Sequence, residues 1–343
     1  MKLHTLSSIV CALALLGTTP TFANSAESKN GPVPVMVEVP ETTFAMGRSA
    51  YENGESDEIP QHMVHLSAHQ IGKYEITNWQ YAAVLNWARE QDYIQANPLR
   101  RFRDTSDSNV YFSGRLLKVI NKDSQIILEN DRYTPIMRDG LFMDDHPVSD
   151  VTWSGAVAYA NWLSEIQGLT PCYDFSTFKR ITPLPNGYRL PTEAEWEHAA
   201  GTQESSSRPS WNYASSTNTI TEQQGNYQLN NPLEAVGMST YPLTSPIGYF
   251  NGQSPNTLDS PSPLGCYDMS GNVQEWCEDW FSTYSKRAKT DPTGPNSGSF
   301  KIVRGGAWNS IKTTCRTTNR GWTQPSNHFR SFGFRIARTP QEK

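Results

Sequence analysis

The stretch Leu264–Trp280 has the sequence LGCYDMSGNVQEWCEDW, and it is the part of the chain that says most about the fold. It contains two glycines, four acidic residues and two tryptophans, and its apolar residues follow neither the helical nor the strand period. Closely spaced carboxylate and carbonyl oxygens are the ligands that Ca²⁺ prefers, whereas buried tryptophans fix a loop from below. The pattern therefore predicts an irregular loop that is anchored in the core and can bind a hard cation.

The composition narrows the class of protein. The chain has 343 residues and a formal net charge of −5, so it has no overall field that would attract nucleic acid or an anionic membrane. Hydrophobic residues make up only 36%, yet there are 10 Trp, 15 Tyr and 13 Phe, together with 23 Gly and 23 Pro. We therefore expect an α+β fold with much irregular structure and a core that depends on aromatic side chains.

The N-terminus has the features of a secretory signal peptide. Lys2 supplies a positive charge, Leu6–Leu16 is a short apolar run, and Thr21–Ala23 offers small residues for cleavage before Asn24. The apolar run is too short to span a bilayer. We therefore expect residues 1–23 to be removed and the mature protein to be exported to the periplasm, without insertion into a membrane.

The remaining chain shows neither an internal repeat nor a linker that would divide it. Residues 24–32 are polar and are expected to be disordered, and residues 33–338 are expected to form one domain. Within this domain, residues 99–134 are a candidate insertion, composed of short strands and turns. Hydroxyl residues at helix N-caps predict three helices. The three capping residues are Thr77, Ser154 and Thr192.

Four cysteines remain once residues 1–23 are removed: Cys172, Cys266, Cys277 and Cys315. An even number of cysteines in an oxidising compartment permits two disulfides, with three alternative pairings. Buried free cysteines that pack as small hydrophobic residues are the other alternative. The sequence leaves both open.

Several segments occur in the order in which one known family has them. They are Phe44-x-Met46-Gly47, Pro60-x-His62-x-Val64, Lys73–Asn78 (KYEITN), His146–Val148 (HPV), Tyr188–Glu197 (YRLPTEAEWE), Gly271–Trp276 (GNVQEW), Arg304–Trp308 (RGGAW) and Gly333–Arg335 (GFR). Together they resemble the family of the formylglycine-generating enzyme, also called the sulfatase-modifying factor domain. The resemblance extends over nearly the whole mature chain.

This resemblance implies a single-domain fold related to C-type lectins, with structural Ca²⁺. In the family, one calcium site uses the run that ends in Gly-Asn-x-x-Glu-Trp. Carried over, its ligands are the side chains of Asp268 and Glu275 and the backbone carbonyls of Gly271 and Val273. Two anionic oxygens and two carbonyls in a tight turn suit this ion.

A second calcium site of the family begins at an Asn followed by an apolar residue. Carried over, these positions are Asn226 and Tyr227. The family's partner Asp has no clear counterpart, because Ser239 occupies its place by spacing. The chain thus departs from the pattern at this second site.

The resemblance also locates the reaction of the namesake enzyme just after the Gly-Gly strand. There the family has two cysteines, spaced Cys-x4-Cys, that bind Cu(I). Counting from Gly305–Gly306, this chain has Ser310 and Cys315 at those positions. A serine hydroxyl is a poor ligand for Cu(I), which prefers thiolates. Copper or iron binding therefore has no paired-cysteine site to support it. With a gap in the alignment, Cys315 instead directly precedes Arg316–Arg320, as in members that lack both cysteines.

The layout is similar to that of the exported single-domain member that matures the pyoverdine chromophore. This similarity implies an oxidative modifying enzyme for an exported peptide, protein or peptide-derived small molecule. Candidate catalytic residues are Cys315, Ser310 and Arg320, with Asn309 and Arg316 nearby.

Two other functions remain open from the sequence. One is a calcium-stabilised, lectin-like binding module without chemistry, which recognises a peptide or a glycan. The other is a structural component of an envelope complex. The true formylglycine-generating reaction is the least supported alternative, because one of its two sulfurs is missing.

Overall fold

The computed structural model describes residues 32–94, 109–121, 123–201 and 211–340. The predicted signal peptide lies outside these described residues, as do all but one residue of the segment predicted to be disordered. The first ten residues of the candidate insertion also lie outside them.

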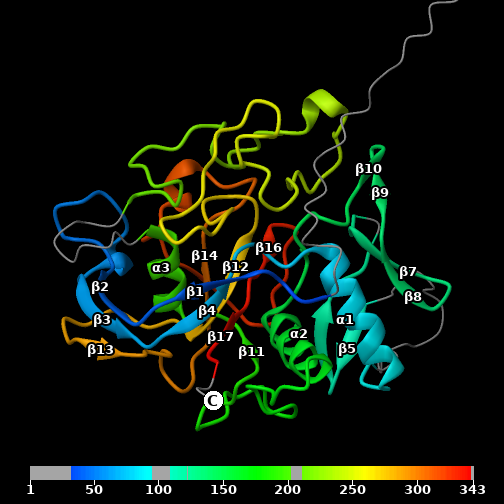
Figure 1. Ribbon diagram of the computed structural model, residues 1–343, viewed down its shortest axis with the longest axis horizontal. Coiled ribbons are helices and arrows are strands. Elements are labelled where there is room, and N and C mark those ends of the chain that lie inside the picture. Colours follow the sequence, from blue (N-terminus) through cyan, green and yellow to red (C-terminus); the bar gives the residue numbers. More distant parts are fainter. Residues whose placement is uncertain (1–31, 95–108, 122, 202–210, 341–343) are drawn as a thin grey trace, which may run out of the picture.

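Three sheets make up the middle and the left side of the fold in the view of Figure 1. The first has the antiparallel order β1 (Met36–Val39), β4 (His69–Gly72), β17 (Ala337–Arg338) and β11 (Tyr188–Arg189). The second has the order β15 (Gly321–Thr323), β14 (Lys301–Arg304), β12 (Gln274–Trp280) and β16 (Phe332–Gly333). The third has the order β13 (Lys289–Thr290), β3 (His62–Leu66) and β2 (Thr42–Met46). The first and third sheets join strands from both halves of the described chain, whereas the second is built from its C-terminal part alone.

The second half of Leu264–Trp280 is strand β12, so the prediction of an irregular loop is wrong for that half. Strand β12 is antiparallel to β14 on one side and parallel to β16 on the other. All its residues from Glu275 to Asp279 are buried. A strand buried on both faces has no alternation of apolar and polar residues, and this is why the sequence period gave no strand signal.

Within the described residues, three α-helices flank the sheets. They are α1 (Asn78–Glu90), α2 (Trp153–Ile166) and α3 (Glu193–Gly201). Helix α1 has the predicted capping box, since Thr77 Oγ1 accepts from the Gln80 backbone N–H at 3.1 Å and Gln80 Oε1 accepts from that of Thr77 at 3.0 Å. The cap of α2 is Thr152 instead of the predicted Ser154, because Thr152 Oγ1 accepts from the Gly155 N–H at 3.0 Å.

An aromatic core joins the two longer helices to the end of the chain. Tyr81 of α1 and Tyr159 of α2 stack with ring centroids 5.5 Å apart. Phe334 packs edge-on against both rings. All three side chains are buried. The expectation of an aromatic core is therefore confirmed, and the Gly333–Arg335 motif supplies one of its rings.

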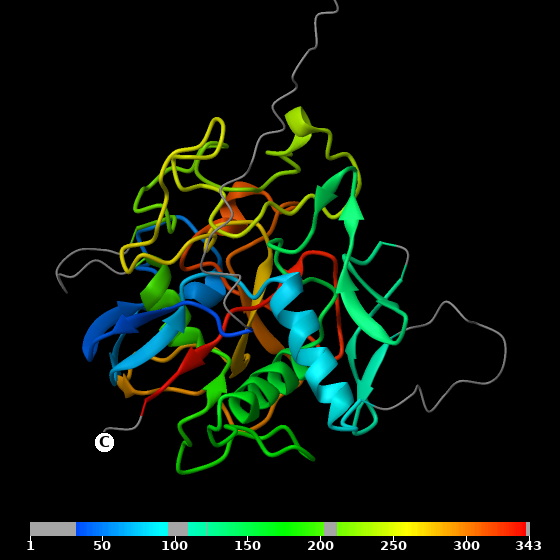
Figure 2. The same cartoon turned by 45° about the vertical axis from the view of Figure 1, so that its right-hand side comes forward.

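The described part of the candidate insertion forms two hairpins beside α1 (Figure 2). One pairs β5 (Val110–Phe112) with β6 (Arg115–Lys118), and the other pairs β7 (Ile126–Glu129) with β8 (Arg132–Pro135). Their buried side chains belong to the same hydrophobic cluster as α1 and α2. A third hairpin follows, with β9 (Met137–Arg138) and β10 (Leu141–Phe142).

Long irregular segments cover the edge of the molecule drawn in yellow in Figure 1. Between α3 and β12 the described residues contain no strand and only the short 3-10 helix η2 (Glu234–Val236). Two further 3-10 helices are η1 (Ser56–Glu58) and η3 (Lys312–Cys315). In the part of the chain that the structure describes, no helix is both long and apolar enough to cross a bilayer.

Candidate functional site

The turn that precedes β12 brings the two groups of predicted calcium ligands together. Gly271 approaches Asn226 so closely that an added Cβ atom would lie 2.2 Å from the Asn226 carbonyl oxygen. That oxygen accepts from the Asn272 backbone N–H at 2.8 Å. Only glycine fits such a contact at a φ of +114°, which explains the glycine of the Gly-Asn motif.

Glu75 fastens this turn to the rest of the fold. Its carboxylate accepts from Asn272 Nδ2 at 2.6 Å and from the Val273 backbone N–H at 3.0 Å. Glu75 belongs to the KYEITN segment just before α1, about 200 residues earlier in the chain. Two motifs that are far apart in sequence are thus two halves of one contact.

Two of the predicted calcium ligands differ in whether their oxygens are free. Asp268 Oδ2 accepts from the Gly248 N–H at 2.6 Å, and its Oδ1 is buried without a hydrogen-bond partner among the described residues. Glu275, in contrast, accepts from Arg335 through both oxygens at 2.7 Å, and from Trp196 Nε1 at 2.9 Å. The free oxygen of Asp268 favours a cation there, whereas Glu275 already has a cationic partner.

The charges of this cluster do not balance. Glu75, Asp268 and Glu275 are buried around one cation, the Arg335 guanidinium. Burial, aided by the neighbouring carboxylates, raises the pKa of Glu75 well above its usual range and that of Asp268 to about 6. Protons or a bound cation can supply the missing positive charge, so calcium at Asp268 stays a prediction.

The second predicted group offers one free amide oxygen but no carboxylate. The Asn226 side chain is buried, donates to the Leu243 carbonyl at 2.7 Å and has an unpartnered Oδ1. Tyr227 donates its hydroxyl to the Ile220 carbonyl at 3.2 Å. The backbone N–H of Ser239 donates to Asp139 at 2.7 Å. Among the described residues, no three His, Cys, Asp or Glu side chains form a metal site.

The predicted catalytic cysteine is a buried, protonated thiol. Cys315 packs against the turn after β14, where a Cβ added to Gly306 would lie 2.6 Å from its sulfur. Burial raises the pKa of the thiol to about 12. A thiol with so high a pKa is a poor nucleophile at neutral pH. All four described cysteines are free and buried, so the disulfide alternative is not what the structure shows.

Ser310 is partly exposed, and its hydroxyl oxygen accepts from the Ala307 backbone N–H at 3.0 Å. This contact closes the turn after the Gly-Gly pair. Asn309 is exposed beside it. Two further residues extend this exposed area. Tyr241 stacks on Trp308 with ring centroids 5.4 Å apart, and Ile311 is exposed beside it. We call the area formed by Tyr241, Trp308, Asn309, Ser310 and Ile311 the Trp308 surface.

Arg320 and Arg316 each hold a buried carboxylate. Arg320 donates to Glu193 of α3 at 2.7 and 2.8 Å. Arg316 donates to Glu58 at 2.7 and 2.5 Å. A buried carboxylate without such a partner would be strongly unfavourable, so these arginines have a structural role in the geometry seen here.

Helix α3 explains why the chain needs so many buried arginines. Its acidic residues Glu195 and Glu197 also pair, with Arg189 and Arg304 respectively. The sequence pattern YRLPTEAEWE thus encodes a buried ion-pair network instead of an exposed amphipathic helix. Arg189 belongs to the same segment as Glu195, whereas the partners of Glu197 and Glu193, Arg304 and Arg320, come from more than 100 residues away.

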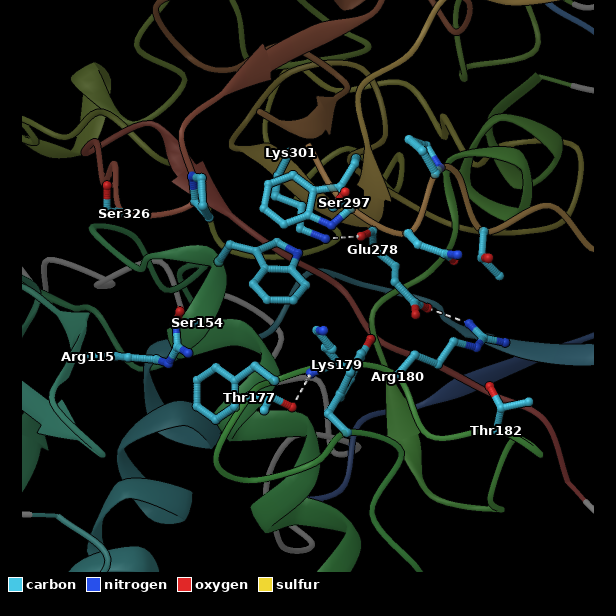
Figure 3. A pocket seen from close by; sticks show the side chains of 18 of the residues that line it. Arg115, Ser154, Thr177, Lys179, Arg180, Thr182, Glu278, Ser297, Lys301 and Ser326 are labelled. Carbon is cyan, nitrogen blue, oxygen red and sulfur yellow. Dashed lines mark hydrogen bonds and ion pairs between the residues drawn. The ribbon is translucent and has the colours of Figure 1, made fainter. Parts of the chain in front are cut away.

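No sequence signal pointed to a cavity with a volume of about 780 Å³ that the described residues form (Figure 3). None of the residues that line this cavity belongs to the Trp308 surface. Trp153 of α2, Trp280 of β12 and Lys301 of β14 line it, together with the loop that contains Lys179 and Arg180. Of these residues, only Trp280 was given a role from the sequence, as one of the two tryptophans that anchor Leu264–Trp280 in the core.

Comparison with known proteins agrees with the fold. The family model described as the sulfatase-modifying factor enzyme 1-like domain matches residues 21–340. The formylglycine-generating enzyme of Thermomonospora curvata is 28% identical over 321 residues, which cover 89% of this chain and 93% of that protein. A Chlamydia pneumoniae protein named serine/threonine-protein kinase pkn1 is 27% identical over 290 residues, or 83% of this chain and 35% of that protein. The chain thus spans about a third of the kinase-named relative.

Solved structures resemble the fold at 23% identity. CarF gives a TM-score of 0.57 and covers 91% of this chain and 100% of its own. Variable protein 1 of Treponema denticola gives 0.55, with 89% and 95% covered. PvdO from Pseudomonas aeruginosa gives 0.52, with 90% and 95% covered. Since the family model matches nearly the whole chain, the predicted α+β single-domain fold is confirmed, and the protein belongs to the sulfatase-modifying factor enzyme 1-like family.

Proposed function

We propose that this chain is an exported modifying enzyme that acts in the periplasm on a peptide or a peptide-derived substrate. Membership of a family that includes formylglycine-generating enzymes supports the modifying role. The signal-like residues 1–23 support export. The oxidative part of the proposal rests on the family resemblance, with O₂ as the oxidant to be tested.

The observation that carries the proposal is the surface beside the Gly305–Gly306 turn. There the ring of Tyr241 stacks on Trp308, with the exposed Asn309 and Ile311 at its border. An aromatic and apolar surface with an amide at its edge suits an extended peptide, because it offers both a hydrophobic contact and a hydrogen-bond partner. The family resemblance locates its reaction on this same segment.

The chemistry at this surface cannot be that of two copper thiolates. Ser310 supplies a hydroxyl where the resemblance expects the first sulfur, and the Cys315 thiol is buried with a raised pKa. If the protein oxidises its substrate, other ligands must hold the redox centre. The formylglycine-generating reaction in its usual form is therefore not proposed.

A binding module without chemistry is the second candidate. The contacts of the candidate catalytic groups favour it. Arg316 and Arg320 already bind the buried carboxylates of Glu58 and Glu193, and the Cys315 thiol is protonated because burial raises its pKa. The Trp308 surface would then bind a peptide and leave it unchanged.

One experiment separates the two candidates. The protein is purified after export, its copper, iron and calcium are measured, and O₂ consumption is followed with cysteine- and tyrosine-containing peptides. Turnover that is lost in Tyr241→Ala and Ile311→Ser, but kept in the control Met63→Ser on β3, would support the enzyme. Peptide binding without O₂ consumption, whatever metal is present, would favour the binding module.

A further inference from the structure

The cavity lined by Trp153 and Trp280 is built from several segments that lie between Gly114 and Ser326 (Figure 3). Its volume of about 780 Å³ lies within the range of small-molecule sites. None of the residues that line it belongs to the Trp308 surface, so it is a separate place on the molecule. It therefore needs an explanation of its own.

The cavity is rich in positive charge although the protein as a whole is acidic. Four cationic side chains line it, against the single carboxylate of Glu278. They are Arg115, Lys179, Arg180 and Lys301. A cleft lined by one sign of charge concentrates its field and attracts ligands of the opposite sign. Because the formal net charge of the whole chain is −5, the excess of positive charge at the cavity does not follow from the composition of the protein.

Two of these cations are not neutralised within the described residues. Arg180 Nη1 pairs with Glu278 at 2.5 Å. Arg115 and Lys179 are exposed, and neither has a carboxylate partner among the described residues. The Arg115 guanidinium lies over the ring of Phe178, 5.1 Å from its centroid, so its position at the cavity is fixed by packing.

Lys301 contributes a buried ammonium group to the lining of the cavity. Its Nζ lies 3.9 Å from the ring centroid of Trp153 and 4.0 Å from that of Trp280, and it donates to the Glu278 carbonyl at 2.6 Å. The lysine is only 4% exposed. Two indole faces and one carbonyl partly replace the water that an ammonium group loses on burial.

The rest of the lining combines aromatic rings with hydroxyl and amide groups, two prolines, a glycine and a leucine. Tyr173 and Phe178 add two rings that are almost fully buried, so the partly exposed ring of the lining is that of Trp280. Small polar groups surround them, among which are Ser154, Thr177 and Asn296. Rings of this kind bind the C–H faces of a sugar, whereas hydroxyl and amide groups can exchange hydrogen bonds with its hydroxyls.

We propose that the Trp153–Trp280 cavity is a binding site for a short acidic oligosaccharide, one of whose sugar rings contacts the indole of Trp280 and whose carboxylates face Arg115 and Lys179. A carboxylate at these positions forms charge-assisted hydrogen bonds, which are stronger than those of a neutral group. The site is independent of the substrate surface proposed above.

The test uses the full-length chain and a trimer of galacturonic acid as probe. The matched control ligand is the same trimer with every carboxylate methyl-esterified, which keeps the rings and removes the charge. Binding is measured by titration calorimetry and by tryptophan fluorescence, since Trp153 and Trp280 line the cavity. We expect the acid to bind at least about tenfold more tightly than the ester.

The variant Arg115→Ala/Lys179→Ala removes two exposed cations and is expected to fold normally. It should weaken binding of the acid by about tenfold or more. The control Lys286→Ala/Arg287→Ala removes the same charge from exposed positions outside the cavity lining and should leave binding unchanged. Equal binding of acid and ester, an equal loss in both variants, or no binding at all would overturn the proposal. Tighter binding of an acidic peptide such as hexaglutamate would overturn the assignment to a sugar.

Discussion

Arg335 donates two hydrogen bonds of 2.7 Å to the buried carboxylate of Glu275. Glu275 lies on the central strand β12, and Arg335 belongs to the GFR motif near the end of the described chain. The same guanidinium donates to the Gly72 and Tyr267 carbonyls at 2.9 and 2.8 Å. One arginine therefore ties together three segments of the fold.

Replacing Arg335 by Leu should destabilise the protein by about 3–5 kcal/mol, because it leaves Glu275 buried without its cation and beside two further carboxylates. Urea unfolding followed by tryptophan fluorescence measures the effect. The control Arg330→Ala removes a half-exposed arginine whose ion pair with Asp123 should contribute less than about 1 kcal/mol. Equal losses in the two variants would show that the buried pair has no special role.

Calcium, if it binds at Asp268, should stabilise the fold. A ligand at 100 times its dissociation constant adds about 2.7 kcal/mol to the free energy of unfolding when it binds only the native state. The melting temperature should then fall in excess EGTA and recover with added calcium. Asp268→Asn should abolish this response, whereas Asp139→Asn, which changes an exposed carboxylate, should retain it. A melting temperature insensitive to EGTA would contradict the calcium prediction.

Local signals in the sequence were enough to place much of the fold. The capping boxes at Thr77 and Thr192 mark the starts of α1 and α3, because a cap depends only on residues within one helical turn. The ordered family motifs identified the fold itself, and their positions in the structure explain their order. Gly271, Asn272 and Glu75, for example, form one contact.

The interior could not be predicted in the same way, because its partners are far apart in sequence. Glu193 and Arg320 are separated by 127 residues, and nothing local indicates that they pair. Strand β12 was missed because burial on both faces removes the alternating pattern. The cavity beside Trp280 could not be predicted either, because its walls come from segments that are far apart in sequence.

Arg320 provides a direct test of a structural against a catalytic role. Arg320→Ala should lower the free energy of unfolding by about 3–5 kcal/mol, because Glu193 would be left buried without this partner. The double variant Arg320→Leu/Glu193→Leu should recover much of the loss, since it removes both charges. An unchanged stability together with a lost activity would instead return Arg320 to the catalytic candidates.

The four buried thiols should be unreactive in the native protein. Cys172, Cys266, Cys277 and Cys315 are free, and burial raises the pKa of each thiol above its ordinary value. Iodoacetamide should therefore leave all four unmodified until a denaturant is added, when peptide mass spectrometry should find each one alkylated. Rapid native labelling of Cys315 would show an accessible thiolate, and a pair that resists labelling after denaturation would show a disulfide.

His146 should make the fold sensitive to mild acid. The imidazole is buried, its Nδ1 lies 2.9 Å from Thr244 Oγ1, and burial lowers its pKa to about 3. The unfolded chain, with an ordinary histidine pKa near 6.5, binds a proton below that pH while the native state does not. Stability is therefore lost as the pH falls from about 6.5 toward 3, by about 1.4 kcal/mol per pH unit.

Removing this titration should flatten the pH dependence of stability. Between pH 7.5 and 5, His146→Gln should lose about 2 kcal/mol less unfolding free energy than the wild type, although it begins from a lower value. His198, whose pKa burial also lowers, to about 4, continues to titrate in the variant, so part of the dependence remains. The half-exposed His65 on β3 provides the control, and His65→Gln should follow the wild-type curve more closely. Parallel curves for His146→Gln and the wild type would mean that the native protein accommodates a charged imidazole at this position.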